Sequence, residues 1–150
     1  MKKLVFSFIG FLMVAIAVAQ VQNPVKWSYT AKKIADKTYE VHISAMIDPG
    51  WHVYTLDHKA DVGVATSVKF AKNPLADLSG TILAKGKPVS LKDPSTGEMV
   101  KFYTNTIDLV QVYKLKTAVP TKITGTLEYM TCDDERCLPP ASKPFTVALQ

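Results

Sequence analysis

Apolar and polar residues alternate along several short segments of the chain, which is the pattern of strands that bury one face. The alternation is clearest over residues 38–47, where five apolar side chains share one face: Tyr39, Val41, Ile43, Ala45 and Ile47. It recurs over residues 123–129 and 145–149. Shorter strands are expected at residues 25–29, 67–70, 80–84, 100–103 and 107–112. The period of two, rather than 3.6, predicts strands and no amphipathic helix.

Turn-forming residues separate these expected strands. They are Asp-Pro-Gly at 48–50, Asn-Pro at 73–74, Asp-Pro-Ser-Thr-Gly at 93–97 and Val-Pro at 119–120. Proline fixes one backbone angle and glycine permits conformations that other residues avoid, so such sequences favour turns. Seven to nine short strands divided in this way predict an all-β fold, an immunoglobulin-like antiparallel β-sandwich.

The amino-terminal segment has the features of an export signal. Lys2 and Lys3 precede an apolar run from Leu4 to Ala19, which ends in the cleavage-type sequence Ala-Val-Ala. We therefore expect a signal peptide over residues 1–19 and one domain over residues 20–150. A retained membrane anchor is the alternative, disfavoured because the run is shorter than the roughly 18 residues that span a bilayer. Export leads to an oxidising compartment, where two nearby thiols normally pair.

The charged residues do not indicate a nucleic-acid-binding protein. The formal net charge is +5, and it falls to +3 without the two lysines of the expected signal peptide. The remaining basic residues are scattered and form no stripe interleaved with aromatic side chains. The sequence also has no nucleophile elbow, phosphate-binding loop or zinc-protease motif, so a hydrolase has little support.

Two cysteines, Cys132 and Cys137, are the residues that can carry chemistry. They follow the strand expected to end at Tyr129 and precede Pro139 and Pro140, so both should lie at a strand end or hairpin tip. A disulfide that closes so short a loop stabilises a fold by only about 2 kcal/mol, against about 4 to 5 for one that joins two sheets. The spacing matches neither a thioredoxin-like C-x-x-C nor a four-ligand zinc pattern. The residues alone leave a structural staple and a redox pair equally open.

The segment Cys-Asp-Asp-Glu-Arg-Cys-Leu-Pro-Pro at 132–140 resembles a motif of the amino-terminal periplasmic domain of the DsbD thiol:disulfide interchange family. The preceding Gly-Thr-Leu-Glu-Tyr at 125–129 and the closing strand at 145–149 fit the same pattern. The resemblance extends over essentially the whole chain after the expected signal peptide, and it is strongest at two motifs.

The second motif is Pro-Gly-Trp-His-Val-Tyr at 49–54, followed by Gly63 and Thr66. It resembles the Gly-Trp-His-x-Tyr segment of the family. Trp27 stands where the family often has a tryptophan in its first strand. Both motifs therefore resemble segments of the same family.

The resemblance implies an immunoglobulin-like sandwich whose cysteines cycle between disulfide and dithiol. It implies that Cys137 forms the mixed disulfide and that Cys132 is the resolving partner, with no bound cofactor. The partners implied are a thioredoxin-like or DsbD-type electron donor and periplasmic proteins that contain disulfides. Well-known family members fuse this domain to a membrane electron carrier and a thioredoxin-like domain, which this sequence lacks, so we expect a separate donor.

In the family, a loop with an aromatic residue covers the cysteines as a cap. The corresponding stretch here is expected to begin at Asp93, with Thr96 at the aromatic position. Either the cap is absent, or a nearby apolar side chain replaces it: Met99, Phe102 or Tyr103.

Aromatic residues are also expected to line the cysteine site, namely His52, Tyr54 and Tyr129. A histidine near thiols can act as a proton shuttle, although a single histidine in a strand is more often simply hydrogen-bonded. Trp51 is expected to pack in the core. A metal site that combines His58 and nearby carboxylates with the cysteines matches no recognised ligand spacing, so no metal is expected.

Two classes of function follow from these observations. The favoured one is a periplasmic protein that relays electrons by thiol-disulfide exchange through Cys132 and Cys137. The alternative is a non-enzymatic exported binding module in which the same disulfide only staples a hairpin. A reduction potential separates them, because structural disulfides typically lie below about −300 mV.

Overall fold

The computed structural model describes residues 22–59 and 61–150. The expected signal peptide, residues 1–19, lies outside the described residues. Within them the chain forms eleven strands and no helix. The described part accordingly contains no helix long and apolar enough to cross a membrane.

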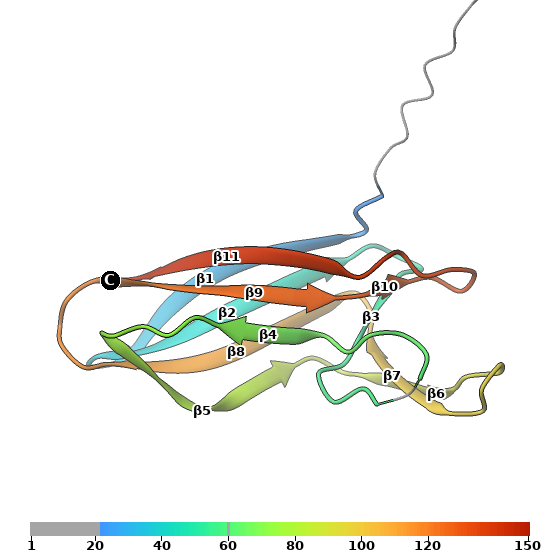
Figure 1. Ribbon diagram of the computed structural model, residues 1–150, viewed down its shortest axis with the longest axis horizontal. Coiled ribbons are helices and arrows are strands. Elements are labelled where there is room, and N and C mark those ends of the chain that lie inside the picture. The colour runs from blue at the N-terminus through green and yellow to red at the C-terminus, as the bar shows by residue number, and fades with distance from the viewer. Residues whose placement is uncertain (1–21, 60) are drawn as a thin grey trace, which may run out of the picture.

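The strands form three antiparallel sheets. The first has the order β1-β2-β8-β5, with β1 at Val25–Ala35, β2 at Thr38–Ile47, β8 at Thr106–Leu115 and β5 at Ala76–Lys85. The second has the order β11-β9-β4, with β11 at Ala141–Leu149, β9 at Thr121–Tyr129 and β4 at Ser67–Phe70. The third has the order β10-β3-β7-β6, with β10 at Thr131–Cys132, β3 at His52–Tyr54, β7 at Met99–Tyr103 and β6 at Val89–Lys92. The first two sheets run along the long axis of the molecule, and the third lies at the end opposite the carboxyl terminus (Figure 1).

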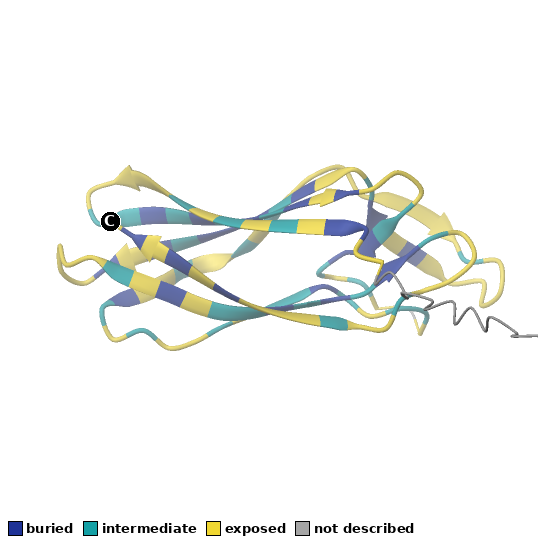
Figure 2. Cartoon of the chain, turned by 90° about the horizontal axis from the view of Figure 1, so that it is seen from above, coloured by how far each residue is buried: buried dark blue, intermediate teal, exposed yellow. Residues whose placement is uncertain are grey.

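The main core lies between the first and second sheets. Every second residue of β2 is buried, from Tyr39 to Ile47, as the alternation predicts. Leu109 of β8, the neighbour of β2 in the same sheet, is fully buried as well. The second sheet contributes Ile123 and Leu127 from β9 and Leu149 from β11, which are also fully buried. Figure 2 shows the resulting bands of buried and exposed residues along the long strands. Burial of one face of each sheet is what holds the two layers together.

The predicted fold class, an immunoglobulin-like antiparallel β-sandwich, is confirmed. All eight expected strands are present, and three more bring the total to eleven instead of seven to nine. The additional strands, β3, β6 and β10, have three, four and two residues. They are too short to show a hydrophobic period in the sequence. Each is defined by its pairing with another strand of the same sheet. All three belong to the third sheet, which carries Cys132.

Candidate redox site

Cys132 and Cys137 form a disulfide, with their Cα atoms 4.0 Å apart. Cys132 is the last residue of β10 and is 1% exposed. Cys137 lies beyond the following turn and is exposed. A molecule that approaches from solvent therefore meets Cys137 first.

The loop between the cysteines is held by its own hydrogen bonds. Oδ1 of Asp133 accepts hydrogen bonds from the backbone N–H groups of Glu135 at 2.9 Å and Arg136 at 2.8 Å. The N–H of Asp133 donates to the carbonyl oxygen of Arg136 at 2.9 Å, and the N–H of Leu138 donates to that of Thr131 at 2.9 Å. The hydrogen bonds from Glu135 and Arg136 hold the pKa of the Asp133 carboxyl below its usual range. The disulfide is thus not the only constraint on this loop.

The register of the third sheet places several side chains on one face with Cys132. Cys132 pairs with His52, and Tyr54 pairs with Phe102. Residues directly opposite each other in an antiparallel pair project to the same side of the sheet. On that side a small buried cluster, here called the cysteine cluster, consists of Tyr54, Val100, Phe102 and Cys132.

The other face of the third sheet joins the main core through Val53 and Tyr103. The sheet therefore separates two apolar regions. One continues the core of the sandwich, and the other surrounds the buried sulfur.

Tyr54 makes the direct polar contact with this sulfur. The residue is 4% exposed, and its hydroxyl lies 3.6 Å from Sγ of Cys132. A disulfide sulfur has no proton, so the tyrosine O–H is the donor. Burial raises the pKa of Tyr54, and the negative charge of Asp93 raises it further. The hydroxyl consequently keeps its proton across the neutral range.

The loop after β3 fixes the ring of Tyr54. Oγ1 of Thr66 donates a hydrogen bond to the carbonyl oxygen of Tyr54 at 2.6 Å. The ring of His58 lies 4.3 Å from the tyrosine ring, measured between centroids. Gly63, with φ +85°, lies so close that a Cβ added there would be 2.2 Å from a ring carbon. Only glycine leaves room for the ring in this position.

His52 lies beside Phe102 and Tyr54, with ring centroids 4.3 and 5.6 Å apart respectively. Burial lowers the pKa of the imidazole, and the carboxylates of Asp134 and Asp133 partly oppose this effect. The ordinary pKa of histidine is about 6.5, so the ring is mainly neutral at pH 7. A neutral imidazole can accept a proton.

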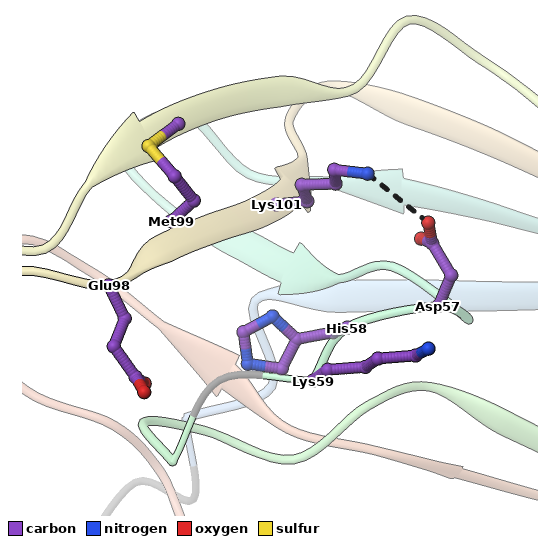
Figure 3. Close-up of a pocket in the computed structure, with 6 residues that line it drawn as sticks. All are labelled: Asp57, His58, Lys59, Glu98, Met99 and Lys101. Atoms are coloured by element: carbon purple, nitrogen blue, oxygen red, sulfur yellow. Dashed lines mark hydrogen bonds and ion pairs between the residues drawn. The ribbon is translucent and has the colours of Figure 1, made fainter.

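A polar pocket flanks the loop that covers Tyr54 (Figure 3). Nζ of Lys101 lies 3.3 Å from Oδ2 of Asp57, the ion pair drawn in the figure. The backbone N–H of Asp61 donates to Oε2 of Glu98 at 2.9 Å. The first contact ties the loop to β7, and the second ties it to the residue that precedes β7. Among the described residues, no group of three His, Cys, Asp or Glu is arranged to hold a metal ion.

Three expected site residues are not members of the cysteine cluster, although the charge of Asp93 acts on Tyr54. Tyr129 belongs to the main core, where its ring centroid is 5.2 Å from that of Trp27. Asp93 and Thr96 lie in the exposed turn between β6 and β7. Oγ1 of Thr96 donates to Oδ1 of Asp93 at 3.2 Å, so the hydroxyl is engaged within its own turn. Of the expected residues, the structure thus brings His52 and Tyr54 to the cysteines.

The three candidate replacements for a cap differ in position. Phe102 belongs to the cysteine cluster and packs beside His52. Met99 is 59% exposed, and Tyr103 is part of the main core. Of the three candidates, Phe102 is therefore the one that shares the buried cluster with Cys132.

Sequence reasoning considered His58 only as a metal ligand and did not name Val100 as a site residue, so it missed the packing role of both. Val100 joins the cluster because β7 pairs with β3, far away in the chain, whereas His58 packs on Tyr54 from the loop that follows β3. No local pattern marks such residues, because neither lies in a distinctive motif.

Comparison with known proteins gives a family for this chain. The family model described as "Thiol:disulfide interchange protein DsbD, N-terminal" matches residues 19–149. A search of curated proteins by sequence found no match.

Solved structures with a similar fold include the reduced DsbD amino-terminal domain of Neisseria meningitidis, at TM-score 0.50 and 17% identity, with 81% of this chain and 84% of that chain covered. The amino-terminal periplasmic domain of ScsB from Proteus mirabilis matches at TM-score 0.51 and 14% identity, over 83% of this chain and 44% of that chain. A complex between the DsbD and PilB amino-terminal domains of N. meningitidis matches at TM-score 0.50 and 17% identity, over 85% of this chain and 87% of that chain. These similarities concern the fold. The family model covers nearly the whole sequence, and the chain belongs to the family of DsbD amino-terminal domains.

Proposed function

We propose that this protein acts in thiol-disulfide exchange through Cys132 and Cys137. The observation that carries the proposal is the unequal exposure of the two bonded cysteines at one end of the sandwich. An exchange protein needs one sulfur that a partner can attack and a second that leaves and later returns. Membership of a thiol:disulfide interchange family supports the same chemistry.

In the reducing step, a thiolate of the donor attacks Sγ of Cys137. The bond between the two cysteines breaks, its electron pair goes to Sγ of Cys132, and a mixed disulfide joins the donor to Cys137. A second donor thiolate then attacks the donor sulfur of this mixed disulfide. The donor leaves oxidised, and the protein is left as a dithiol.

In the delivering step, the thiolate of Cys137 attacks the disulfide of a substrate protein and releases one substrate thiolate. Cys132 then attacks Sγ of Cys137, restores the disulfide and releases the second substrate thiol. Two electrons pass from donor to substrate in the complete cycle. Exchange requires only an accessible sulfur and a docking surface, so no bound cofactor is needed.

The proposed setting is the periplasm, with residues 20–150 as the mature domain after removal of residues 1–19. The proposed donor is a thioredoxin-like or DsbD-type protein, and the proposed acceptors are periplasmic proteins with disulfides. A similar structure in which a DsbD amino-terminal domain is bound to the PilB amino-terminal domain supports docking of a protein partner.

The test is the reduction potential of the disulfide in a dithiothreitol or glutathione redox buffer, read by thiol alkylation and mass spectrometry. Thermal unfolding of both redox states is followed in parallel. The proposal expects a potential above about −300 mV and a domain that stays folded when reduced. A disulfide that resists reduction until the domain unfolds would refute the proposal and favour the stapled binding module.

Single-cysteine variants sharpen this test. Cys132→Ala leaves the exposed cysteine without its resolving partner, so it should accumulate mixed disulfides with partner proteins. Cys137→Ala is the matched control, because its remaining thiol is buried and should capture far less. Equal capture by the two variants would contradict the assigned roles.

A further inference from the structure

The proposed exchange creates a negative charge in a buried place. When the disulfide opens, the leaving sulfur is that of Cys132, which is 1% exposed. Burial disfavours a thiolate and raises its pKa, and a thiol with a high pKa is a slow leaving group. The opening step at this position therefore needs a hydrogen-bond donor.

Tyr54 supplies a donor at this position. Its hydroxyl lies 3.6 Å from Sγ of Cys132, and both groups are buried. The sulfur of a disulfide is a weak acceptor, whereas a thiolate carries a full charge and accepts a much stronger hydrogen bond. The same contact thus becomes more favourable as the bond breaks, which is the condition for accelerating the step.

We propose that Tyr54 is a catalytic residue of this exchange, whose hydroxyl stabilises the thiolate that forms on Cys132 as the disulfide opens. The inference rests on the proposed function. The donor thiolate bonds to Sγ of Cys137, the electron pair of the broken bond goes to Sγ of Cys132, and the tyrosine keeps its proton while it donates the hydrogen bond. The thiolate later takes a proton from solvent or attacks Cys137 again.

The surroundings of Tyr54 favour this role. The carbonyl oxygen accepts a hydrogen bond from Thr66, and the ring is confined by Gly63 and His58. A donor held in place before the reaction does not have to be reorganised as charge develops. The tyrosine is therefore positioned by the loop that follows its own strand.

Other ionisable groups lie near this sulfur or near Tyr54, and they affect any measurement of the Cys132 pKa. They are His52 on β3, His58 in the next loop, Asp93 in the turn after β6, and Asp133, Asp134, Glu135 and Arg136 in the loop between the cysteines. None of them is altered by removal of the tyrosine hydroxyl alone, so a Tyr54→Phe substitution isolates one interaction.

The experiment measures the rate at which dithiothreitol reduces the disulfide in the wild type, Tyr54→Phe and Tyr39→Phe. Tyr39 is the control, because it is as well buried as Tyr54 but lies in the main core, beside the last two residues of the chain and away from the cysteines. We expect the disulfide of Tyr54→Phe to be reduced more slowly than that of the wild type, by a factor of about three or more, and that of Tyr39→Phe to be reduced at the wild-type rate. In the reduced protein, the pKa of Cys132, followed by the NMR shift of its Cβ carbon, should rise by about one unit in Tyr54→Phe.

A Tyr54→Phe protein that is reduced as fast as the wild type, with an unchanged pKa at Cys132, would overturn the inference. If the substitution impairs folding, a fluorinated tyrosine at position 54 replaces it. This more acidic donor retains the ring, so it should speed the reduction, and an unchanged rate would count equally against the role of Tyr54. Failure of the proposed function looks different, because the wild type itself would then resist reduction in the folded state.

Discussion

His52 on β3 lies directly opposite Cys132 on β10, so the imidazole and the buried sulfur project from the same face of the third sheet. The ring also packs on Phe102, with centroids 4.3 Å apart. Burial lowers the pKa of His52 despite the carboxylates of Asp134 and Asp133 nearby. A neutral histidine in the folded state has a consequence for stability that can be measured.

The folded protein is expected to lose stability through His52 as the pH falls. Unfolded histidine titrates near pH 6.5, and the folded residue titrates lower, so between these values the unfolded state binds more protons. The loss begins below about pH 6.5 and is complete below the folded pKa. Urea denaturation from pH 5 to 8 should therefore show that His52→Gln softens the decline in acid. The variant also loses the packing of His52 on Phe102, which changes its free energy of unfolding by an amount that does not vary with pH.

Asp134→Asn serves as the companion variant. The carboxylate of Asp134 raises the pKa of His52, so its removal should lower that pKa further and deepen the acid loss. The wild type and the His52→Gln variant should not differ in their pH dependence above about pH 8. A stability difference that is constant from pH 5 to 8 would mean that His52 is not held neutral by burial.

The loop between the cysteines is expected to keep its conformation when the disulfide is reduced. Asp133 accepts two backbone hydrogen bonds there, and they do not depend on the S–S bond. Asp133→Ala should therefore speed amide hydrogen exchange at Glu135 and Arg136, more in the reduced than in the oxidised protein. Asp134→Ala, which removes a neighbouring exposed carboxylate, is the control and should leave these two amides unchanged. Equal exchange in both variants would show that the disulfide alone orders the loop.

The long strands could be predicted from the sequence because each buries one face over many residues. β2 alternates over ten residues, and its buried positions agree with the pattern. The third sheet could not be predicted in this way. Its strands β3 and β10 have three and two residues, and their place depends on pairing partners distant in the chain. The part of the fold that holds the site is thus the part with the weakest local signal.

The candidate site was predictable where a motif marks it and less so elsewhere. The two cysteines, His52 and Tyr54 lie in the two segments that resemble the family, and the structure brings them together. Tyr129 was expected beside them but packs on Trp27 in the main core. An odd separation from Cys132 in extended chain turns the two side chains to opposite faces. Proximity in sequence was therefore a poor guide to proximity in space.

The two thiols of the reduced protein should differ in reactivity. Cys137 is exposed, whereas Cys132 lies in a buried cluster with Phe102 and Tyr54. Iodoacetamide added in limiting amount should modify Cys137 first, because the reactivity of a thiol depends on its accessibility as well as on its pKa. Mass spectrometry of peptides after short labelling times measures the ratio. Labelling of Cys132 at a similar rate in the folded protein would contradict the assignment of Cys137 as the attacking residue.

Gly63 is expected to be the least replaceable glycine near the site. Its φ is +85°, and a Cβ there would lie 2.2 Å from the ring of Tyr54. Gly80 is the matched control, with φ +73° and no atom within 4 Å of an added Cβ. Gly80→Ala should cost only the backbone strain, about 1 to 2 kcal/mol, whereas Gly63→Ala should cost more and move the tyrosine ring.

Movement of the ring would separate its hydroxyl from Sγ of Cys132. Gly63→Ala should therefore slow reduction of the disulfide by dithiothreitol, as Tyr54→Phe does, while Gly80→Ala should not. In the double variant of Gly63→Ala and Tyr54→Phe the two effects on the rate should not add, because both remove the same hydrogen bond. Additive slowing would show that Gly63 influences the disulfide by another route, and that the loop does more than hold Tyr54 in place.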